Sequence, residues 1–148
     1  MMEQVPQRYP DDDQWHVAGS DGYVAYHERE MALLVEVLRR YDVPLVLLDA
    51  PYMRPEDDRY GHRPEEVDAW NAVIDGWDRD YAEVFHMDFG RWFPEAGSDA
   101  DRRARPDSVH VAAEFALQVC RDHVVPQLSA ALDEWSATEA GAGADAAG

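Results

Sequence analysis

Two short apolar runs, set between segments of helical periodicity, restrict the folds open to this chain. The run at 43–49 reads Val-Pro-Leu-Val-Leu-Leu-Asp and is continuous rather than alternating. Continuous apolar runs of this length are typical of strands buried on both faces of a parallel sheet. A second run at 82–89 is weaker and predicts the next strand. The chain is therefore expected to form a parallel sheet.

Helical spacing dominates the segments around the two runs. Apolar residues recur at this spacing from Asp21, the predicted N-cap of a first helix, and again after Pro64, which suits a first helical turn. On the second helix Asn71 interrupts the apolar face and is expected to bond backbone groups at the sheet edge. A last helix is predicted from Ala112 and is disturbed at Pro126. The order helix, strand, helix, strand, helix is the rhythm of an α/β fold.

The ends of the chain and one long connection lack this periodicity. We expect an irregular lead-in over 1–20, an α/β domain over 21–134 and a disordered Ala/Gly tail over 135–148. The connection at 90–106 also reads as irregular. Two strands make a thin sheet, since doubly wound domains normally have more, so N-terminal strands are expected to be missing from the chain as given.

Charge and composition exclude several classes of function. The 148 residues carry 31 acidic and 13 basic side chains, the latter all arginine, for a formal charge of −18. Such a surface repels phosphate backbones and anionic lipid, so nucleic acids and membrane surfaces are not expected partners. The single cysteine, Cys120, rules out an internal disulfide and a cysteine-based zinc site. No apolar stretch has the length of a membrane span or forms a signal-peptide core, so the chain as given reads as soluble and unexported.

The segment before the last predicted helix places an acid and an imidazole close together. Asp107 and His110 are three residues apart in the sequence Arg-Pro-Asp-Ser-Val-His at 105–110. Imidazole acts as a general base near neutral pH, and a carboxylate that binds its other nitrogen fixes the tautomer. The same spacing also arises when an aspartate caps a helix beside a surface histidine. Spacing alone therefore leaves both interpretations open.

Five segments, taken in order, carry a family resemblance: 43–52, 67–73, 84–88, 105–110 and 125–128. The first two are similar to a buried strand that ends in a Pro-Tyr-like loop and to the helix that follows it. The third is similar to the next strand, which ends in aspartate. The last two are similar to an Arg-x-Asp-Gly-x-His block and to the last helix of the same family. Together they resemble the C-terminal part of an SGNH (GDSL-type) hydrolase, in particular the domain attached to bacterial membrane O-acyltransferases that acetylate cell-envelope polysaccharides.

This resemblance implies a partial doubly wound, flavodoxin-like fold of three layers and an esterase or O-acetyltransferase that needs no cofactor. Asp107 is then the orienting acid and His110 the general base. From their position at the carboxyl end of the first strand, Tyr52 and Met53 are candidates either to line an acyl or sugar pocket or to pack within the loop. The glycine usual in this block is Ser108 here. The implied substrate is an acylated carbohydrate or a small ester, and the family context implies an intact enzyme outside the cytoplasmic membrane.

The nucleophile block of the family, Gly-Asp-Ser, and its oxyanion-hole glycine and asparagine have no counterpart in the sequence. Ser20 lies in Gly-Ser-Asp, the same letters in another order, and reads as a cap or loop serine. The chain is therefore expected to be nearly inactive alone. It reads as a truncated reading frame, a degenerate paralogue or one half of a split domain, completed by an N-terminal segment or a partner chain.

Two other interpretations stay open. In the first, a non-catalytic α/β module uses the loops around Tyr52, Tyr60 and Trp92 to contact a sugar or a protein. In the second, four residues have the types of a metal set, although their spacing matches no known zinc or iron motif, so no metal is expected. These four residues are His86 and Asp88 with His62 or His110.

Overall fold

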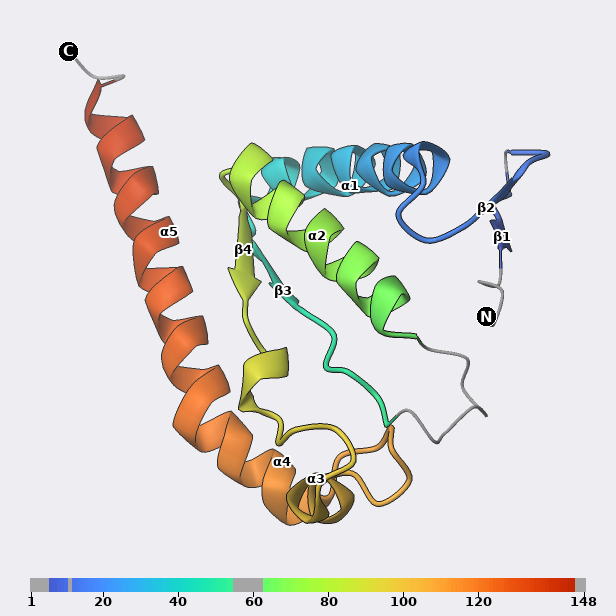
Figure 1. Ribbon diagram of the computed structural model, residues 1–148. Coiled ribbons are helices and arrows are strands. Elements are labelled where there is room, and N and C mark those ends of the chain that lie inside the picture. Colours follow the sequence, from blue (N-terminus) through green and yellow to red (C-terminus); the bar gives the residue numbers. More distant parts are fainter. Residues whose placement is uncertain (1–5, 11, 55–62, 146–148) are drawn as a thin grey trace.

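A short parallel sheet with helices on both faces forms the centre of the molecule (Figure 1). The computed structural model describes residues 6–10, 12–54 and 63–145, with side chains up to residue 137. Within these residues a small antiparallel hairpin precedes the first helix. The predicted mixed α/β class is confirmed.

Helix α1 spans Asp21–Tyr41, as its apolar spacing predicts. Its N-cap is Ser20 rather than Asp21, because the Ser20 hydroxyl accepts the backbone N–H of Tyr23 at 3.4 Å. Asp21 instead occupies the first turn, where a negative charge interacts favourably with the helix dipole. The helix ends at Asp42, whose φ of 52° lies in the left-handed region that stops a helix.

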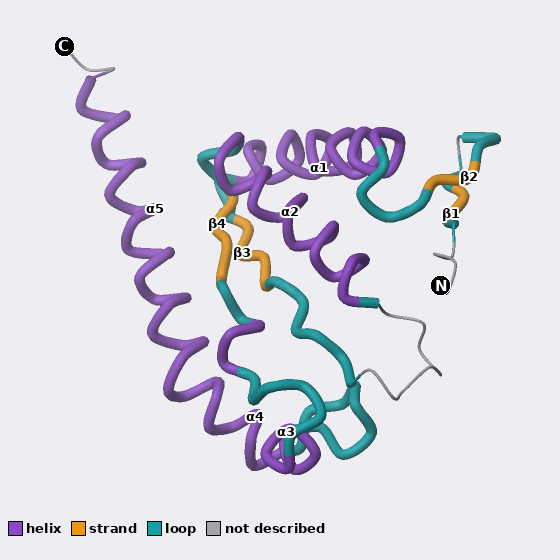
Figure 2. The backbone as a smooth tube through the Cα atoms, viewed as in Figure 1, coloured by secondary structure: helices purple, strands orange, loops and turns teal. Residues whose placement is uncertain are grey.

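The sheet consists of β3 (Leu45–Leu48) and β4 (Val84–Met87), which run parallel (Figure 2). Helix α2 (Pro64–Asp80) connects them, with the proline in its first turn. Leu45 is paired with Val84 in the register. Both predicted strands are confirmed, and each is shorter than its apolar run.

The two faces of the sheet are covered differently. Leu45 and Leu47 pack against the core cluster that α1 and α2 supply, whereas Val46 points to the other face, as strand alternation requires. On that second face a groove of about 560 Å³ separates the sheet from the last helix, and Val46 and Ala131 line it from opposite sides. The sheet is therefore tightly packed on one face and loosely covered on the other.

An aromatic cluster lies between α1, α2 and the N-terminal hairpin of β1 (Gln7–Arg8) and β2 (Trp15–His16). The predicted irregular lead-in over 1–20 thus contains paired strands, which hold Tyr9 against α1 with its ring stacked on Tyr26 at 3.6 Å between centroids. Buried aromatic rings dominate packing energy because each removes a large apolar area from water. The other rings in contact are Tyr23, His27, Trp70 and Trp77.

The predicted irregular connection at 90–106 contains two helical segments. A 3₁₀ turn, η2, spans Gly90–Trp92, and α3 spans Asp99–Ala104. Ser98 starts α3 by accepting the N–H of Asp101 through its hydroxyl at 3.1 Å. The short helix escapes prediction because it spans less than two turns and is held by buried charges rather than by an apolar stripe.

The C-terminal helical arm consists of α4 (Ala113–Val119), a π-helical segment η3 (Cys120–Val124) and α5 (Val125–Asp145). The disturbance predicted at Pro126 is real: the N–H of Val125 bonds the carbonyl of Cys120, because the proline that follows has no N–H for the regular ladder. Helix α5 continues to Asp145, through most of the segment where the sequence predicts a disordered tail over 135–148. Alanine has the highest helix propensity, which accounts for the continued helix.

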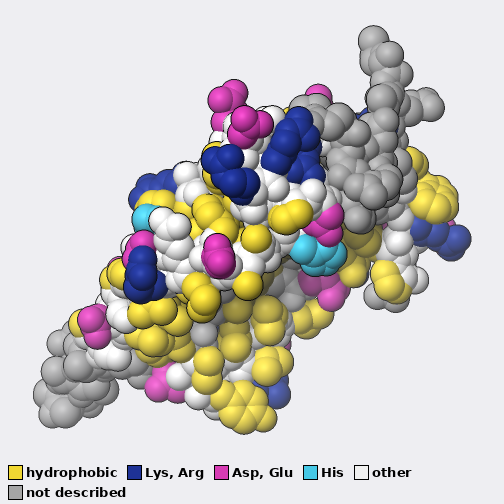
Figure 3. All heavy atoms as spheres, turned by 90° about the horizontal axis from the view of Figure 1, so that it is seen from below, with side chains coloured by type: hydrophobic (Ala, Val, Ile, Leu, Met, Phe, Trp, Pro, Cys, Tyr) yellow, Lys and Arg dark blue, Asp and Glu magenta, His cyan; other side chains and the backbone are white. Residues whose placement is uncertain are grey.

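Exposed apolar side chains are numerous, and Figure 3 shows them gathered over much of the face seen from below. In the part of the chain that the structure describes, none of the helices has the length and apolar character needed to cross a bilayer. Many of the large exposed apolar side chains come from α1 and from the C-terminal arm: Leu33, Leu34, Val37, Tyr41, Leu117, Val125, Leu128 and Leu132.

Candidate functional site

The loop between α3 and α4 brings Asp107 and His110 together. One carboxylate oxygen of Asp107, Oδ1, accepts the backbone N–H groups of Val109 at 3.1 Å and His110 at 2.7 Å. The other, Oδ2, lies 2.6 Å from Nδ1 of the His110 ring. The His110 side chain, followed by these two backbone bonds, holds the pKa of Asp107 well below its usual range. Asp107 therefore remains a carboxylate at neutral pH.

His110 is arranged as a base with a free outer nitrogen. Its ring is bound through Nδ1, which leaves Nε2 as the atom that can take a proton. The side chain is 80 % exposed, and among the described residues no hydroxyl is hydrogen-bonded to Nε2. The pair thus has the orienting half of a catalytic triad, and Nε2 is open to a nucleophile from elsewhere.

Ser108 holds the turn between the acid and the base in place. Its φ of 74° lies in the left-handed region that favours glycine, so a serine here is conformationally costly. The serine side chain is fully buried and its hydroxyl accepts the backbone N–H of Arg54 at 3.0 Å. The hydrogen bond helps to offset the conformational cost, so the turn forms with serine.

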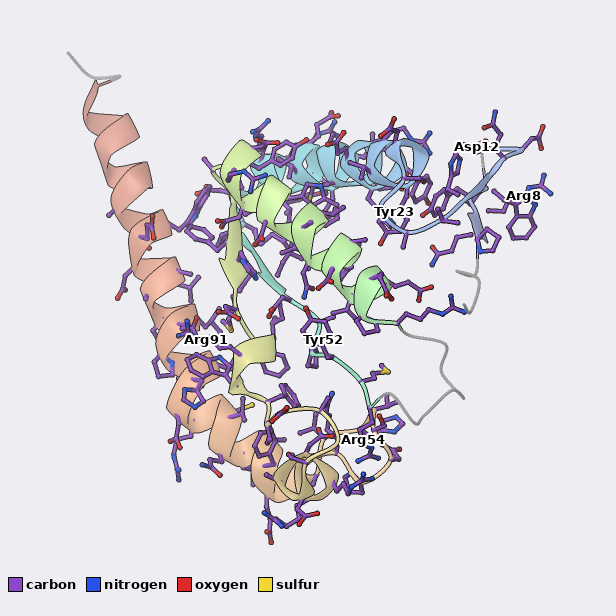
Figure 4. The ribbon with its side chains drawn as sticks, in the orientation of Figure 1. Arg8, Asp12, Tyr23, Tyr52, Arg54 and Arg91 are labelled. Carbon is purple, nitrogen blue, oxygen red and sulfur yellow. The ribbon has the colours of Figure 1, made fainter. Side chains whose placement is uncertain are left out.

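A buried ionic cluster lies directly beneath this loop and consists of Arg54, Asp101 and Arg105. Arg105 donates to Oδ1 of Asp101 from Nε at 2.8 Å and from Nη2 at 2.5 Å. Arg54 reaches the same loop (Figure 4) and donates to the carbonyls of Arg105 at 2.8 Å and Pro106 at 3.1 Å. The two backbone carbonyls that precede Asp107 are therefore fixed by one guanidinium.

The charges of this cluster are almost fully withdrawn from water. The side chains of Asp101, Arg105 and Arg54 are 0 %, 2 % and 7 % exposed. Asp101 also accepts the backbone N–H of Gly97 at 3.0 Å, so both of its oxygens are occupied. Buried ions that are fully hydrogen-bonded resist rearrangement, because any movement leaves a charge without a partner.

The carboxyl ends of the two strands are joined by polar side chains. Asn71 bonds both backbone groups of Ala50, accepting its N–H at 2.8 Å and donating to its carbonyl at 3.1 Å, which confirms the predicted role at the sheet edge. Asp49 accepts the N–H of Gly90 at 2.7 Å. A side chain at Gly90 would place a Cβ 3.0 Å from the Asp49 carboxylate, so this close approach favours glycine.

Tyr52 lies beyond the end of β3 and lines a cavity of about 360 Å³ with Phe93 and Arg105. Its hydroxyl donates to the carboxylate of Asp68, and this bond raises the pKa of Tyr52. Met53, the other residue predicted to line a pocket, is half-buried and does not border this cavity. Of the predicted pair, therefore, only the tyrosine lines this cavity.

Two other residues singled out in the sequence, Ser20 and His86, have structural contacts. Ser20 caps α1, at the far side of the molecule from the loop that carries His110 (Figure 1). His86 pairs with Asp75 at 2.9 Å, and the described residues contain no cluster of three side chains suited to a metal ion. His62 and Tyr60 lie outside the described residues.

Sequence reasoning missed Arg54 and Asp101 and assigned no role to Arg105. Asp101 and Arg105 are four residues apart, a spacing that favours an ion pair on a helix, but the segment was expected to be irregular. Nothing in the local sequence signals Arg54, because its hydrogen-bond partners lie more than fifty residues further along the chain. Comparisons with family models, curated proteins and solved structures found no match to this chain.

Proposed function

We propose that the chain supplies the acid–base part of an SGNH-type ester hydrolase or O-acetyltransferase that acts on acylated carbohydrate. The observation that carries the proposal is the bond between Asp107 and Nδ1 of His110, which orients the ring and leaves Nε2 exposed. The doubly wound SGNH-type fold is part of the same proposal. Its support is the parallel order of β3 and β4 and the helix that connects them.

The position of the pair also supports this proposal. In open α/β sheets, ligands bind beyond the carboxyl ends of the strands. The segment after β3 leads to Arg54, whose backbone and side chain bind the loop of Asp107. The segment after β4 leads to Phe93, which borders the same cavity as Tyr52. Acid, base and cavity are therefore all connected to this edge of the sheet.

The chemistry follows from the free nitrogen. A hydroxyl nucleophile gives its proton to Nε2 of His110 as its oxygen attacks the ester carbonyl, and Asp107 stabilises the imidazolium that forms. The protonated ring then returns the proton to the departing sugar oxygen, and the acyl group passes to water or to a second sugar hydroxyl. The nucleophile comes from outside the set of residues described around His110.

The proposal is tested by hydrolysis of 4-nitrophenyl acetate, an ester so activated that an oriented base without a protein nucleophile can still accelerate its hydrolysis by water. His110→Gln should lower the rate above background by about tenfold or more, because general-base catalysis contributes at least this factor. Asp107→Asn should lower it as well, since the ring loses its preferred tautomer. His123→Gln is the matched control, because this histidine stacks on Trp92 and lies outside the pair. Equal rates in the parent chain and the His110 variant would contradict the proposal.

A fluorophosphonate probe then identifies the nucleophile. The chain alone should give no adduct that depends on His110, because no described hydroxyl contacts Nε2. A serine adduct, located by mass spectrometry, that disappears in His110→Gln would show a complete triad within one chain. Such an adduct would support the esterase function and contradict the proposal that the nucleophile comes from outside the chain.

The alternative is a non-catalytic binding module for a sugar or a protein. One observation favours it: among the described residues, those lining the Tyr52 cavity do not include His110. Acetylated oligosaccharide that binds equally well to the parent chain and to His110→Gln, without turnover, would support this module. Loss of binding in Tyr52→Ala would locate the ligand in the cavity.

A further inference from the structure

The cavity beside Tyr52 has in its wall a charged side chain that is otherwise withdrawn from water. Arg105 lines this cavity of about 360 Å³, although its side chain is only 2 % exposed. Its guanidinium binds Asp101 along one side, through Nε at 2.8 Å and Nη2 at 2.5 Å. Because the guanidinium is a rigid fork, Nη1 is directed away from this ion pair. Nη1 has no acceptor among the described residues.

The Nη1 atom of Arg105 is open to a ligand. In the described part of the chain, the side-chain nitrogens that protein atoms enclose and leave without a partner are those of Trp77, His86 and Trp92. Nη1 is not one of them, so the protein does not enclose it. The ring of Phe93 lies over the same guanidinium, with the Arg105 Cζ 5.0 Å from the ring centroid. The donor is therefore held in place before a ligand binds, which reduces the cost of binding.

The buried charges beneath the cavity do not balance. Arg54 and Arg105 carry two positive charges, whereas Asp101 is the single acid of their cluster. Glu83, the other buried acid of the described residues, pairs with Arg39 at 3.1 Å. A buried charge without a counter-charge is costly, and an anion in the cavity lowers this cost. The cluster therefore favours an anion at Nη1.

The rest of the wall favours an apolar ligand body over a sugar. The rings of Tyr52 and Phe93 line the cavity together with a proline. Polar groups of the wall are already used within the chain: the Tyr52 hydroxyl donates to Asp68, and the Gly90 N–H donates to Asp49. The N–H of Phe93 donates to the carbonyl of Gly90. A sugar would lose hydrogen bonds to water that these groups cannot replace, whereas an apolar ring loses none.

We propose that the Tyr52 cavity binds a small carboxylate with a flat apolar body, and that the carboxylate accepts from Nη1 of Arg105. The body lies against the rings of Tyr52 and Phe93. Hydrogen bonds between ionised groups are about twice as strong as those between neutral groups, so the charge fixes the orientation of the ligand. Among the described residues, those that line the cavity do not include His110, so the inference is independent of the proposed esterase function.

Titration with benzoate, followed by NMR, tests the site. Benzoate should cause saturable shifts of the amides of Gly90 and Ala96, which line the cavity, and of the Nε–H of Arg105. Benzamide has the same ring without the charge and should bind at least about tenfold more weakly. Glucuronate keeps the carboxylate but replaces the ring by a polyol, and it should also bind at least about tenfold more weakly.

Each of the three ligands can overturn the proposal. Benzamide that binds as tightly as benzoate would exclude an anion site, and glucuronate that binds as tightly would exclude the apolar body. Benzoate that causes no saturable shift at Gly90, Ala96 and Arg105 would exclude the site altogether.

A charge variant at the cavity tests the same proposal without disturbing the buried cluster. Glu95 lines the cavity and is exposed, so its carboxylate repels a bound anion. Glu95→Gln should tighten benzoate binding by about two- to fivefold at low salt. Glu114→Gln is the matched control, because it changes the net charge equally and this exposed glutamate does not line the cavity. Binding that is unchanged or weaker in Glu95→Gln, or an equal gain in Glu114→Gln, would contradict a carboxylate in this cavity.

Discussion

The two halves of this protein are held together by different forces. In the first half, α1, α2 and the hairpin enclose aromatic and aliphatic side chains, among them Ile74 and Trp77. In the second half, the loop of the candidate site lies over two buried arginines and a buried aspartate. Apolar burial is non-directional and stabilises many similar arrangements, whereas buried charges accept few. The first region supplies stability, and the second fixes the geometry of Asp107 and His110.

The largest effect is expected from Asp101→Asn, which removes the only anion of the buried cluster. Arg105 and Arg54 are left without a buried counter-charge, so the free energy of unfolding should fall by about 3–5 kcal/mol. The measurement is urea denaturation, with Asp99→Asn as the control because Asp99 is exposed on the same helix. The ring signals of His110 should shift in the first variant only. Unchanged signals would show that the cluster does not fix the loop.

Truncation of the apolar region gives the contrasting result. Ile74 is 1 % exposed, so Ile74→Ala should lower the free energy of unfolding by about 2–5 kcal/mol through lost burial and a new cavity. The His110 signals should stay in place, because the substitution touches no ionic partner of the loop. If they move as far as in Asp101→Asn, the division of roles between the two regions is wrong.

Substitutions of Ser108 separate two contributions to the stability of its turn, the hydrogen bond to Arg54 and the left-handed backbone. Ser108→Ala keeps the left-handed backbone but leaves the buried N–H of Arg54 without an acceptor, at a cost of about 1–3 kcal/mol. Ser108→Gly loses the same bond but relieves a backbone strain of about 1–2 kcal/mol. Thermal unfolding should therefore rank both the parent chain and the glycine variant above the alanine variant. An alanine variant more stable than the glycine variant would contradict the conformational argument.

The smallest effect on stability is expected at His27 in the aromatic cluster. It is a loss of stability on acidification and is absent above neutral pH. Burial lowers the pKa of His27, with a smaller opposing contribution from Glu30. Because the folded state binds this proton less readily, stability is fully present above the unfolded pKa of about 6.5 and falls as pH drops through the lower folded value. His27→Phe should flatten the loss of stability between pH 7 and 5, followed by urea denaturation at each pH. Identical slopes in both chains would exclude His27 as the cause.

Much of the fold could be predicted because its signals are periodic. Helices α1 and α2 and both strands of the sheet follow from apolar spacing, and the disturbance near Pro126 follows from a missing N–H. The hairpin and α3 could not be predicted in this way. Each is short, and each forms because Tyr9 or Asp101 finds a buried position in another part of the molecule. Their stability is tertiary rather than local.

The same distinction applies to the candidate site. Asp107 and His110 are three residues apart, so one turn suffices to join them, and the sequence could predict their contact. Only the tertiary structure decided that Arg54 supports this turn and that Asp78 binds the outer edge of β4. Those contacts depend on which segments the packed core brings side by side. Sequence spacing carries information about neighbours along the chain, but it does not specify partners that meet only when the apolar faces are buried.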